Sequence, residues 1–151
     1  MFIASLFVCL CLLSSGLGFV EIDELRKMVT NPSDNAELWM LENDRVSPRS
    51  SIIQRVNAIV ARQPANIQNI YRNLVAREKA EDQAKYQSKL MQLRYRNASP
   101  QQIQALQQAY QIKTNMALSR QQASNQKNLI YRNAYAWGST DSRDNSFEWD
   151  D

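Results

Sequence analysis

The sequence predicts an all-α fold, a small bundle of about five to six helices that includes one long polar helix and ends in a disordered acidic tail. Three observations lead to this prediction. Residues 19–137 contain no glycine. The same span has no sustained alternation of β-branched and polar residues, and it lacks the Asn-Gly and Asp-Gly pairs that mark hairpins. Apolar residues instead recur at spacings of three and four, which is typical of amphipathic helices.

The first element is an apolar run over residues 2–13, followed by small residues that include Gly16 and Gly18. A run of about 12 residues is too short to span a bilayer, which needs about 20 helical residues. We therefore expect residues 1–18 to be a secretory signal peptide, cleaved after Gly18 or, as the second choice, after Gly16. Both cysteines of the chain lie inside the run. The mature protein is thus expected to be extracellular and free of disulfides.

The rest of the ordered chain, residues 19–137, is expected to form a single helical domain. Prolines stand where a first helical turn tolerates them, and Ser99 and Ser119 each precede a glutamine by three residues, a capping-box pattern. These signals predict helices over residues 21–30, 35–43, 48–62, 65–96, 100–115 and 120–136.

The middle of the longest predicted helix, residues 77–89, has a thin apolar stripe. This stretch is expected to project into solvent or to bridge two parts of the core. Its carboxylates, Glu78, Glu81 and Asp82, are the residues that a hydrolase of this sequence would use, but no apolar pocket is evident around them. A solvated helix face is the favoured interpretation of all three.

Charge divides the chain into three segments. Residues 19–50 carry a net charge of −3, residues 51–137 carry +10 and residues 138–151 carry −4. The last segment is rich in Ser, Asp and Asn without a helical stripe, which predicts a disordered acidic tail. The basic body could bind sulfated glycans or acidic membrane surfaces by releasing counterions, whereas nucleic acid is not expected to meet a secreted protein. A solvated basic surface is the favoured alternative, because the basic residues are spread over several helices.

The tripeptide Tyr-Arg-Asn occurs three times, beginning at Tyr71, Tyr95 and Tyr131, without a fixed period. Arginine supplies charge and forked donors while tyrosine can stack, so the repeats could form an anion-binding surface. In the favoured alternative the tyrosines line the edge of the core and the arginines lie in solvent. The candidate anion-binding residues are Arg72, Arg96 and Arg132.

A possible glycosylation site is Asn97, because Asn97-Ala98-Ser99 fits the acceptor pattern for N-linked glycans. Pro100 follows the pattern directly and disfavours occupancy. Ser99 also has a second use as the cap of the next helix.

Several classes of chemistry are not expected. The chain has no histidine, no cysteine after the predicted signal peptide and too few glycines for a phosphate-binding loop. The acidic ends lack the spacing of a calcium loop. We therefore expect no catalytic residue, no metal ligand and no cofactor-binding residue, and a protein that is not an enzyme.

Amphipathic helices in a secreted chain without mature cysteines also suit a small apolar ligand, held between helices or in the bundle core. Methionines would give such a cavity adaptable walls. An ordinary packed core is the favoured alternative interpretation of these residues: Met28, Met40, Met91 and Met116.

One part of the chain resembles a known family. The stretch Ile-Lys-Thr-Asn-Met-Ala-Leu-Ser-Arg-Gln-Gln at residues 112–122, with Ser-Pro before it and Leu-Ile after it, resembles the SXP/RAL family of secreted nematode proteins. The resemblance covers residues 99–133. It implies an all-helical extracellular protein, with a short linker between two helices at the Asn and Leu-Ser positions and without an assigned enzymatic activity.

Together these observations predict a secreted, non-enzymatic helical binding protein. Its expected ligand is a small apolar molecule such as a lipid, or the surface of an extracellular protein. The alternative is an electrostatic binder of sulfated glycans or acidic membrane surfaces.

Overall fold

The structure is a computed structural model that describes residues 21–135. The predicted signal peptide, both cysteines and the predicted acidic tail at 138–151 lie outside the described residues. Residues 21–135 form six helices and no strand, which confirms the all-α fold. None of these six helices combines the length and the apolar character needed to cross a membrane.

The helices agree with the predicted ranges to within a few residues. They are α1 (Ile22–Met28), α2 (Pro32–Asn43), α3 (Arg49–Ala61), α4 (Ala65–Tyr95), α5 (Pro100–Thr114) and α6 (Arg120–Tyr135).

The largest difference is at the start of α2, which begins at Pro32 instead of residue 35. The side-chain oxygen of Asn31 accepts hydrogen bonds from the backbone N–H groups of Ser33 and Asp34, at 2.9 and 3.3 Å. This cap satisfies two donors of the first turn, and proline is well suited to the first helical position because it has no N–H to satisfy.

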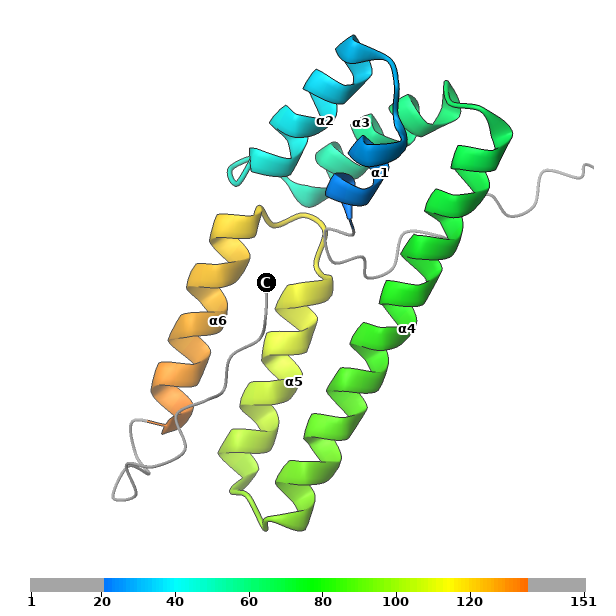
Figure 1. Cartoon of the computed structure of the whole chain (residues 1–151). Helices are drawn as coiled ribbons and strands as arrows, with labels where there is room; N and C mark the ends of the chain where they lie inside the picture. The colour runs from blue at the N-terminus through cyan, green and yellow to red at the C-terminus, as the bar shows by residue number, and fades with distance from the viewer. Residues whose placement is uncertain (1–20, 136–151) are drawn as a thin grey trace, which may run out of the picture.

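The six helices form two groups joined by α4. Figure 1 shows α1, α2 and α3 clustered at one end, while α4 runs from this cluster to the opposite end of the molecule. Helix α5 packs against α4, and α6 packs against α5. At a rise of about 1.5 Å per residue, α4 is roughly 46 Å long, so it is the element that sets the length of the molecule.

Buried apolar side chains form two separate clusters along α4. The larger lies among α1, α2, α3 and the first turns of α4, and it includes Leu25, Leu38 and Ile59, which are fully buried. The smaller joins the end of α4 to α5 through Leu90, Leu93 and Leu106. Of the two alternatives for the middle of α4, the structure confirms the second: this stretch bridges two parts of the core.

The bridging stretch is fixed to α5 by two side-chain contacts. Asp82 accepts a hydrogen bond from the ammonium of Lys113 at 2.8 Å. One turn further along α4, the rings of Tyr86 and Tyr110 are stacked, with their centroids 4.2 Å apart. These contacts set the register between α4 and α5 where few aliphatic side chains are available.

A buried arginine connects the two groups of helices. Arg49, in the first turn of α3, donates to the backbone carbonyl oxygens of Ile112, Lys113 and Asn115 at 2.7 Å each and to that of Leu118 at 3.2 Å. The carbonyls at the end of a helix lack partners within the helix and carry partial negative charge. The guanidinium therefore caps α5, and the dipole of α5 compensates for the burial of its positive charge.

Backbone hydrogen bonds also connect the two groups of helices. The loop between α2 and α3 pairs with the loop between α5 and α6, where the N–H groups of Arg49 and Ser50 donate to the carbonyls of Leu118 and Met116 at 3.2 and 2.9 Å. In the other direction, the N–H of Gln121 donates to the carbonyl of Arg45 at 3.1 Å. Two loops about 70 residues apart in the sequence thus form one junction.

The turn between α4 and α5 is also tightly bonded. Asn97 has a φ of 53°, which places its backbone in the left-handed region. The N–H of Asn97 donates to the carbonyl of Arg94 and that of Ala98 donates to Leu93, a pattern that closes the end of a helix. Ser99 and Gln102 then form the predicted capping box at the start of α5.

Candidate functional site

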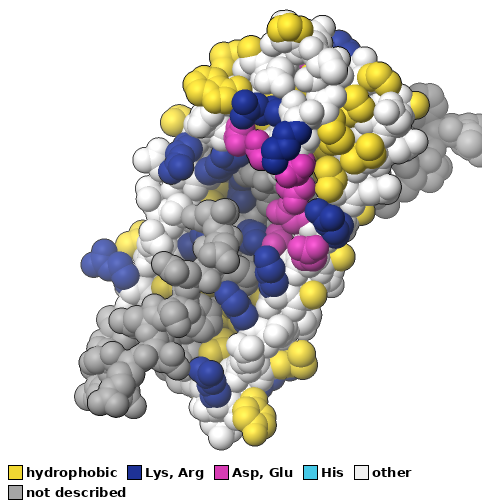
Figure 2. Space-filling model, in the orientation of Figure 1, with side chains coloured by type: hydrophobic (Ala, Val, Ile, Leu, Met, Phe, Trp, Pro, Cys, Tyr) yellow, Lys and Arg dark blue, Asp and Glu magenta, His cyan; other side chains and the backbone are white. Residues whose placement is uncertain are grey.

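A charged cleft of about 880 Å³ opens where the two groups of helices meet. Each of the six helices, or a residue that flanks it, contributes to the lining. Figure 2 shows acidic side chains gathered in the middle of this face with basic side chains around them. The charged lining consists of six acidic and six basic residues: Glu21, Asp23, Glu42, Glu78, Glu81 and Asp82 with Arg45, Arg49, Lys85, Lys113, Arg120 and Lys127.

The acidic wall of the cleft belongs mainly to α4. Asp82 is buried and paired with Lys113, so a cation already balances its charge. Glu78, one turn earlier, is half-buried and forms no ion pair with a described residue. Burial raises the pKa of Glu78, and the nearby charges of Asp82 and Glu21 raise it further, whereas Lys113 acts in the opposite direction. The negative charge of Glu78 is therefore only partly compensated.

Glu21 extends this wall from the residue before α1. Its backbone is left-handed, with a φ of 52°. One carboxylate oxygen, Oε1, lies 3.5 Å from Nη2 of Arg77. The other, Oε2, is buried and has no hydrogen-bond partner among the described residues. A buried oxygen without a donor is unfavourable. Because Oε2 has almost no exposed surface, Glu21 contributes negative charge to this wall and not a contact atom.

The basic wall lies where α2 ends and α6 begins. Arg120 donates to the backbone carbonyl of Glu42 and lies near Arg45 and Arg49. Burial lowers the pKa of Arg120, and the nearby Arg45 lowers it further, whereas Glu42 and Asp44 act in the opposite direction. Like charges are thus crowded on this side of the cleft. The guanidinium of Arg45 is exposed and forms no ion pair with a described residue.

The prediction of a solvated face for the α4 carboxylates was wrong for Glu78 and Asp82. Only Glu81 is exposed, and all three line the cleft. Helix α1 packs against α4, and residues of α6 line the same cleft as these carboxylates, an arrangement that the local charge pattern cannot reveal. No histidine or cysteine supplements the carboxylates, and within residues 21–135 no three acidic, histidine or cysteine side chains are grouped as a metal site would require. The arrangement is suited to binding charged groups.

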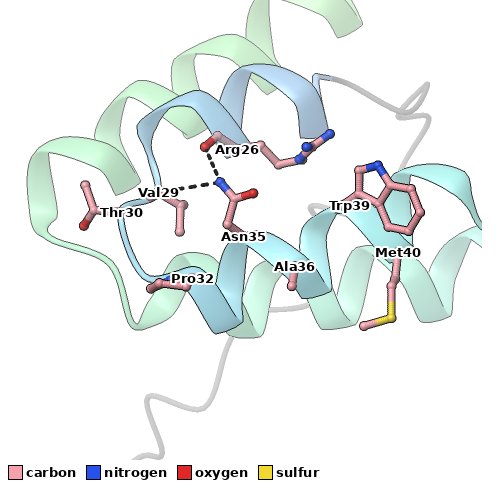
Figure 3. Close-up of a pocket in the computed structure, with 8 residues that line it drawn as sticks. All are labelled: Arg26, Val29, Thr30, Pro32, Asn35, Ala36, Trp39 and Met40. Atoms are coloured by element: carbon pink, nitrogen blue, oxygen red, sulfur yellow. Dashed lines mark hydrogen bonds between the residues drawn. The ribbon is translucent and has the colours of Figure 1, made fainter.

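A second, more apolar groove, open to solvent, lies between α1 and α2. This groove has a volume of about 650 Å³. Figure 3 shows Trp39 and Met40 at one end of a row of side chains along α2, with Pro32 at the other end. Both Trp39 and Met40 keep 54% of their surface exposed. The full lining is Arg26, Val29, Thr30, Pro32, Asn35, Ala36, Trp39 and Met40.

The polar edge of the groove is held in a fixed geometry. The side-chain amide of Asn35 donates to the carbonyl oxygens of Arg26 and Val29 at 2.8 and 3.4 Å, which ties α2 to the end of α1. Nη1 of Arg26 donates to a carboxylate oxygen of Glu42 at 2.6 Å. The Nε of Arg26 is buried and has no partner among the described residues.

The three candidate anion-binding arginines do not form one compact site. Arg72 and Arg96 are separated by almost the whole of α4, roughly 36 Å at the helical rise. Arg72 donates to the side chain of Asn69 at 2.6 Å, and Arg132 is exposed in the last turn of α6. Anion binding at each arginine stays a prediction.

The tyrosines that precede these arginines match the predicted placement at the edge of the core only in part. Tyr71 is buried at the edge of the larger core, as expected, and Tyr131 is half-buried. Tyr95, in contrast, is 90% exposed. The exposure of Tyr95 contradicts a placement at the core edge. In this turn of α4 the residue that faces α5 is Leu93, and Tyr95, two residues later, lies about 200° further around the helix.

The methionines do not line a common cavity either. Met40 borders the α1–α2 groove, whereas Met28 packs against the larger core. Met91 is 61% exposed on α4, and Met116 lies in the loop before α6. The possible glycosylation site, Asn97, is exposed in the turn after α4, and its modification stays a prediction.

No family model, no curated protein and no solved structure matches this chain. The resemblance to the SXP/RAL family therefore stays a prediction.

Proposed function

We propose that this chain is a secreted, non-enzymatic binding protein whose α1–α2 groove holds a small amphiphile, a molecule of the fatty-acid kind with an apolar chain and an oxygen-bearing head. The observation that carries the proposal is the pair Trp39 and Met40, two large apolar side chains that are half exposed beside an open groove. Covering such surface with an apolar chain is favourable by about 25 cal/mol per Å².

The two side chains suit an apolar chain for different reasons. The indole of Trp39 offers a large and rigid contact area at a low cost in conformational entropy. The thioether of Met40 is flexible and polarizable, so it adapts to chains of different shape. Val29, Pro32 and Ala36 supply the remaining apolar lining.

The polar edge of the groove suits the head of such a molecule. Arg26 lines this edge and keeps 27% of its side chain exposed. Its guanidinium can therefore donate a charge-assisted hydrogen bond to an oxygen of the head. The bond from Arg26 to Glu42 holds the guanidinium in place for this contact.

A displacement assay with a fluorescent fatty acid, 11-(dansylamino)undecanoic acid, tests the proposal. The wild-type protein should bind the probe at one site per chain, and oleate should displace it. Trp39→Ala and Met40→Ala should each weaken binding about tenfold. Met91→Ala is the matched control, because Met91 is similarly exposed but lies on α4, away from the groove. An equal loss in the control, or no binding to the wild type, would contradict the proposal.

Secretion has a separate test. Protein recovered from the medium of cells that secrete it should begin at Phe19, or at Leu17 if the second cleavage site is used.

Mass spectrometry of organic extracts from the secreted protein should find a stoichiometric lipid. An empty extract would count heavily against the amphiphile.

The alternative function, electrostatic binding of sulfated glycans or acidic membrane surfaces, is less favoured. The acidic and basic residues that line the cleft are equal in number. A polyanion would gain little attraction in that cleft. This alternative predicts that the protein is retained on immobilised heparin and that retention weakens steeply with salt. A protein that passes through the column unretained at low ionic strength would contradict it.

A further inference from the structure

The charged cleft between the two groups of helices contains charges of both signs that form no ion pair within the described residues. Among the charged residues that line it, Glu78 on α4 and Arg45 in the loop after α2 form no ion pair with a described residue. Lys85, also on α4, likewise has no ion pair within the described part of the chain. Opposite charges that line one cleft usually form an ion pair with each other. Glu78 and Arg45 line the same cleft but do not pair.

The two signs are held apart by the fold. Glu78 and its neighbour Glu21 lie where the start of α1 meets the middle of α4. Arg45 lies in a loop that the hydrogen bond from Gln121 fixes to the start of α6. The four hydrogen bonds of Arg49 fix the start of α3, next to this loop, to the end of α5 and the α5–α6 loop. The loop of Arg45 is thus held beside α5 and α6, whereas Glu78 belongs to α4.

Each wall carries a strain that an opposite charge would relieve. On the acidic side, Glu78 is half-buried without an ion pair among the described residues, and burial with the charges of Asp82 and Glu21 raises its pKa against the opposite effect of Lys113. On the basic side, burial and the nearby Arg45 lower the pKa of Arg120, whereas Glu42 and Asp44 act in the opposite direction. A single cation would relieve only the first wall, and a single anion only the second.

We propose that the cleft binds a small zwitterion, an ω-amino acid or a short peptide, with its ammonium at Glu78 and its carboxylate at Arg45. The ammonium donates to the carboxylate of Glu78, which lies near the negative charges of Asp82 and Glu21. The guanidinium of Arg45 donates to the carboxylate, a pairing that its planar fork favours. The volume of about 880 Å³ accommodates a molecule of this size. The site is separate from the α1–α2 groove, so it does not depend on the proposed function.

Isothermal titration calorimetry with a length series of ω-amino acids tests the proposal. Glycine, 4-aminobutyrate and 6-aminohexanoate differ only in the distance between their charges. One of them should bind at one site per chain, at least tenfold more tightly than the singly charged amine and carboxylate of the same length. Equal binding of the amine or of the carboxylate overturns the proposal, as does the failure of every member of the series to bind.

Substitutions locate the site. Glu78→Gln and Arg45→Gln should each weaken binding of the zwitterion at least tenfold. Glu78→Gln should also reduce its advantage over the carboxylate, and Arg45→Gln its advantage over the amine. Lys79→Gln is the control, since Lys79 is exposed on α4 and does not line the cleft. Circular dichroism confirms folding of each variant. Unchanged affinity in folded Glu78→Gln and Arg45→Gln would overturn the assignment.

Discussion

The carboxylate of Asp82 on α4 lies 2.8 Å from the ammonium of Lys113 at the end of α5, and the two side chains keep only 12% and 23% of their surface exposed. This ion pair lies on the wall of the cleft. It fixes the register of α4 and α5 at the point where apolar contacts are sparse. Its contribution should therefore exceed that of the ion pairs on the surface.

Replacing Lys113 with methionine should lower the free energy of unfolding by about 2 kcal/mol, because Asp82 would remain as a poorly compensated buried charge. Urea denaturation measures the change. Lys27→Met is the control, since Lys27 forms exposed pairs with Asp23 and Glu24 that should contribute little to stability. Equal effects of the two substitutions would show that the pair at Asp82 is not special.

Replacing Arg49 should be more damaging. Arg49→Met removes the cap of α5 and leaves several carbonyl oxygens without donors, so we expect a loss of about 3 kcal/mol or more. Arg49→Lys should restore little, because an ammonium cannot reproduce the planar fork. Arg55→Met, which breaks the exposed pair with Glu37, should cost less than about 1 kcal/mol in the same thermal or urea melts. Full rescue by lysine would argue against the fork geometry.

The left-handed residue after α4 allows a conformational test. Asn97→Ala should destabilise the protein by about 1 kcal/mol, because alanine tolerates a positive φ less well. Asn97→Gly should be neutral or stabilising, since glycine adopts this conformation readily. Melting temperatures of the two variants, compared with Asn73→Ala on the exposed surface of α4, provide the measurement. A loss of stability with glycine would contradict this account.

The burial of Glu78 predicts a pH dependence. A carboxyl whose pKa is raised on folding binds a proton more readily in the folded state, so it destabilises the protein above that pKa and this penalty disappears as the pH falls through it. Glu78→Gln should therefore stabilise the protein at pH 7 by roughly 0.5 kcal/mol. The gain should shrink as the pH is lowered towards 4. Urea melts between pH 4 and 8 measure the difference, and a gain that grows on acidification would contradict the assignment.

The helices could be predicted closely because their boundaries depend on local chemistry. The side chains of Ser99 and Gln102 each accept a hydrogen bond from the other residue's backbone N–H, and the prolines occupy first turns, all within a few residues of sequence. The start of α2 was missed by three residues, although Asn31 before Pro32 is a recognisable capping signal.

The cleft could not be predicted because it depends on contacts between distant segments. Glu21 and Arg77 are brought together by the packing of α1 on α4, and Arg49 reaches the end of α5 from 63 or more positions away. No local pattern distinguishes Arg49 from the exposed arginines. The depletion of apolar residues around Glu78 indicated a polar region correctly, but it could not indicate that residues of α1 and α6 would line a cleft with it.

The capping of α5 by Arg49 also bears on the order in which the chain folds. The carbonyl groups that satisfy this arginine are made only after more than 60 further residues have been added to the nascent chain. Closing so long a loop carries a large entropic penalty before any contact is gained. We therefore expect the α1–α3 cluster to collapse early as a loose intermediate, and the docking of α5 and α6 to be the slow step that completes the native state.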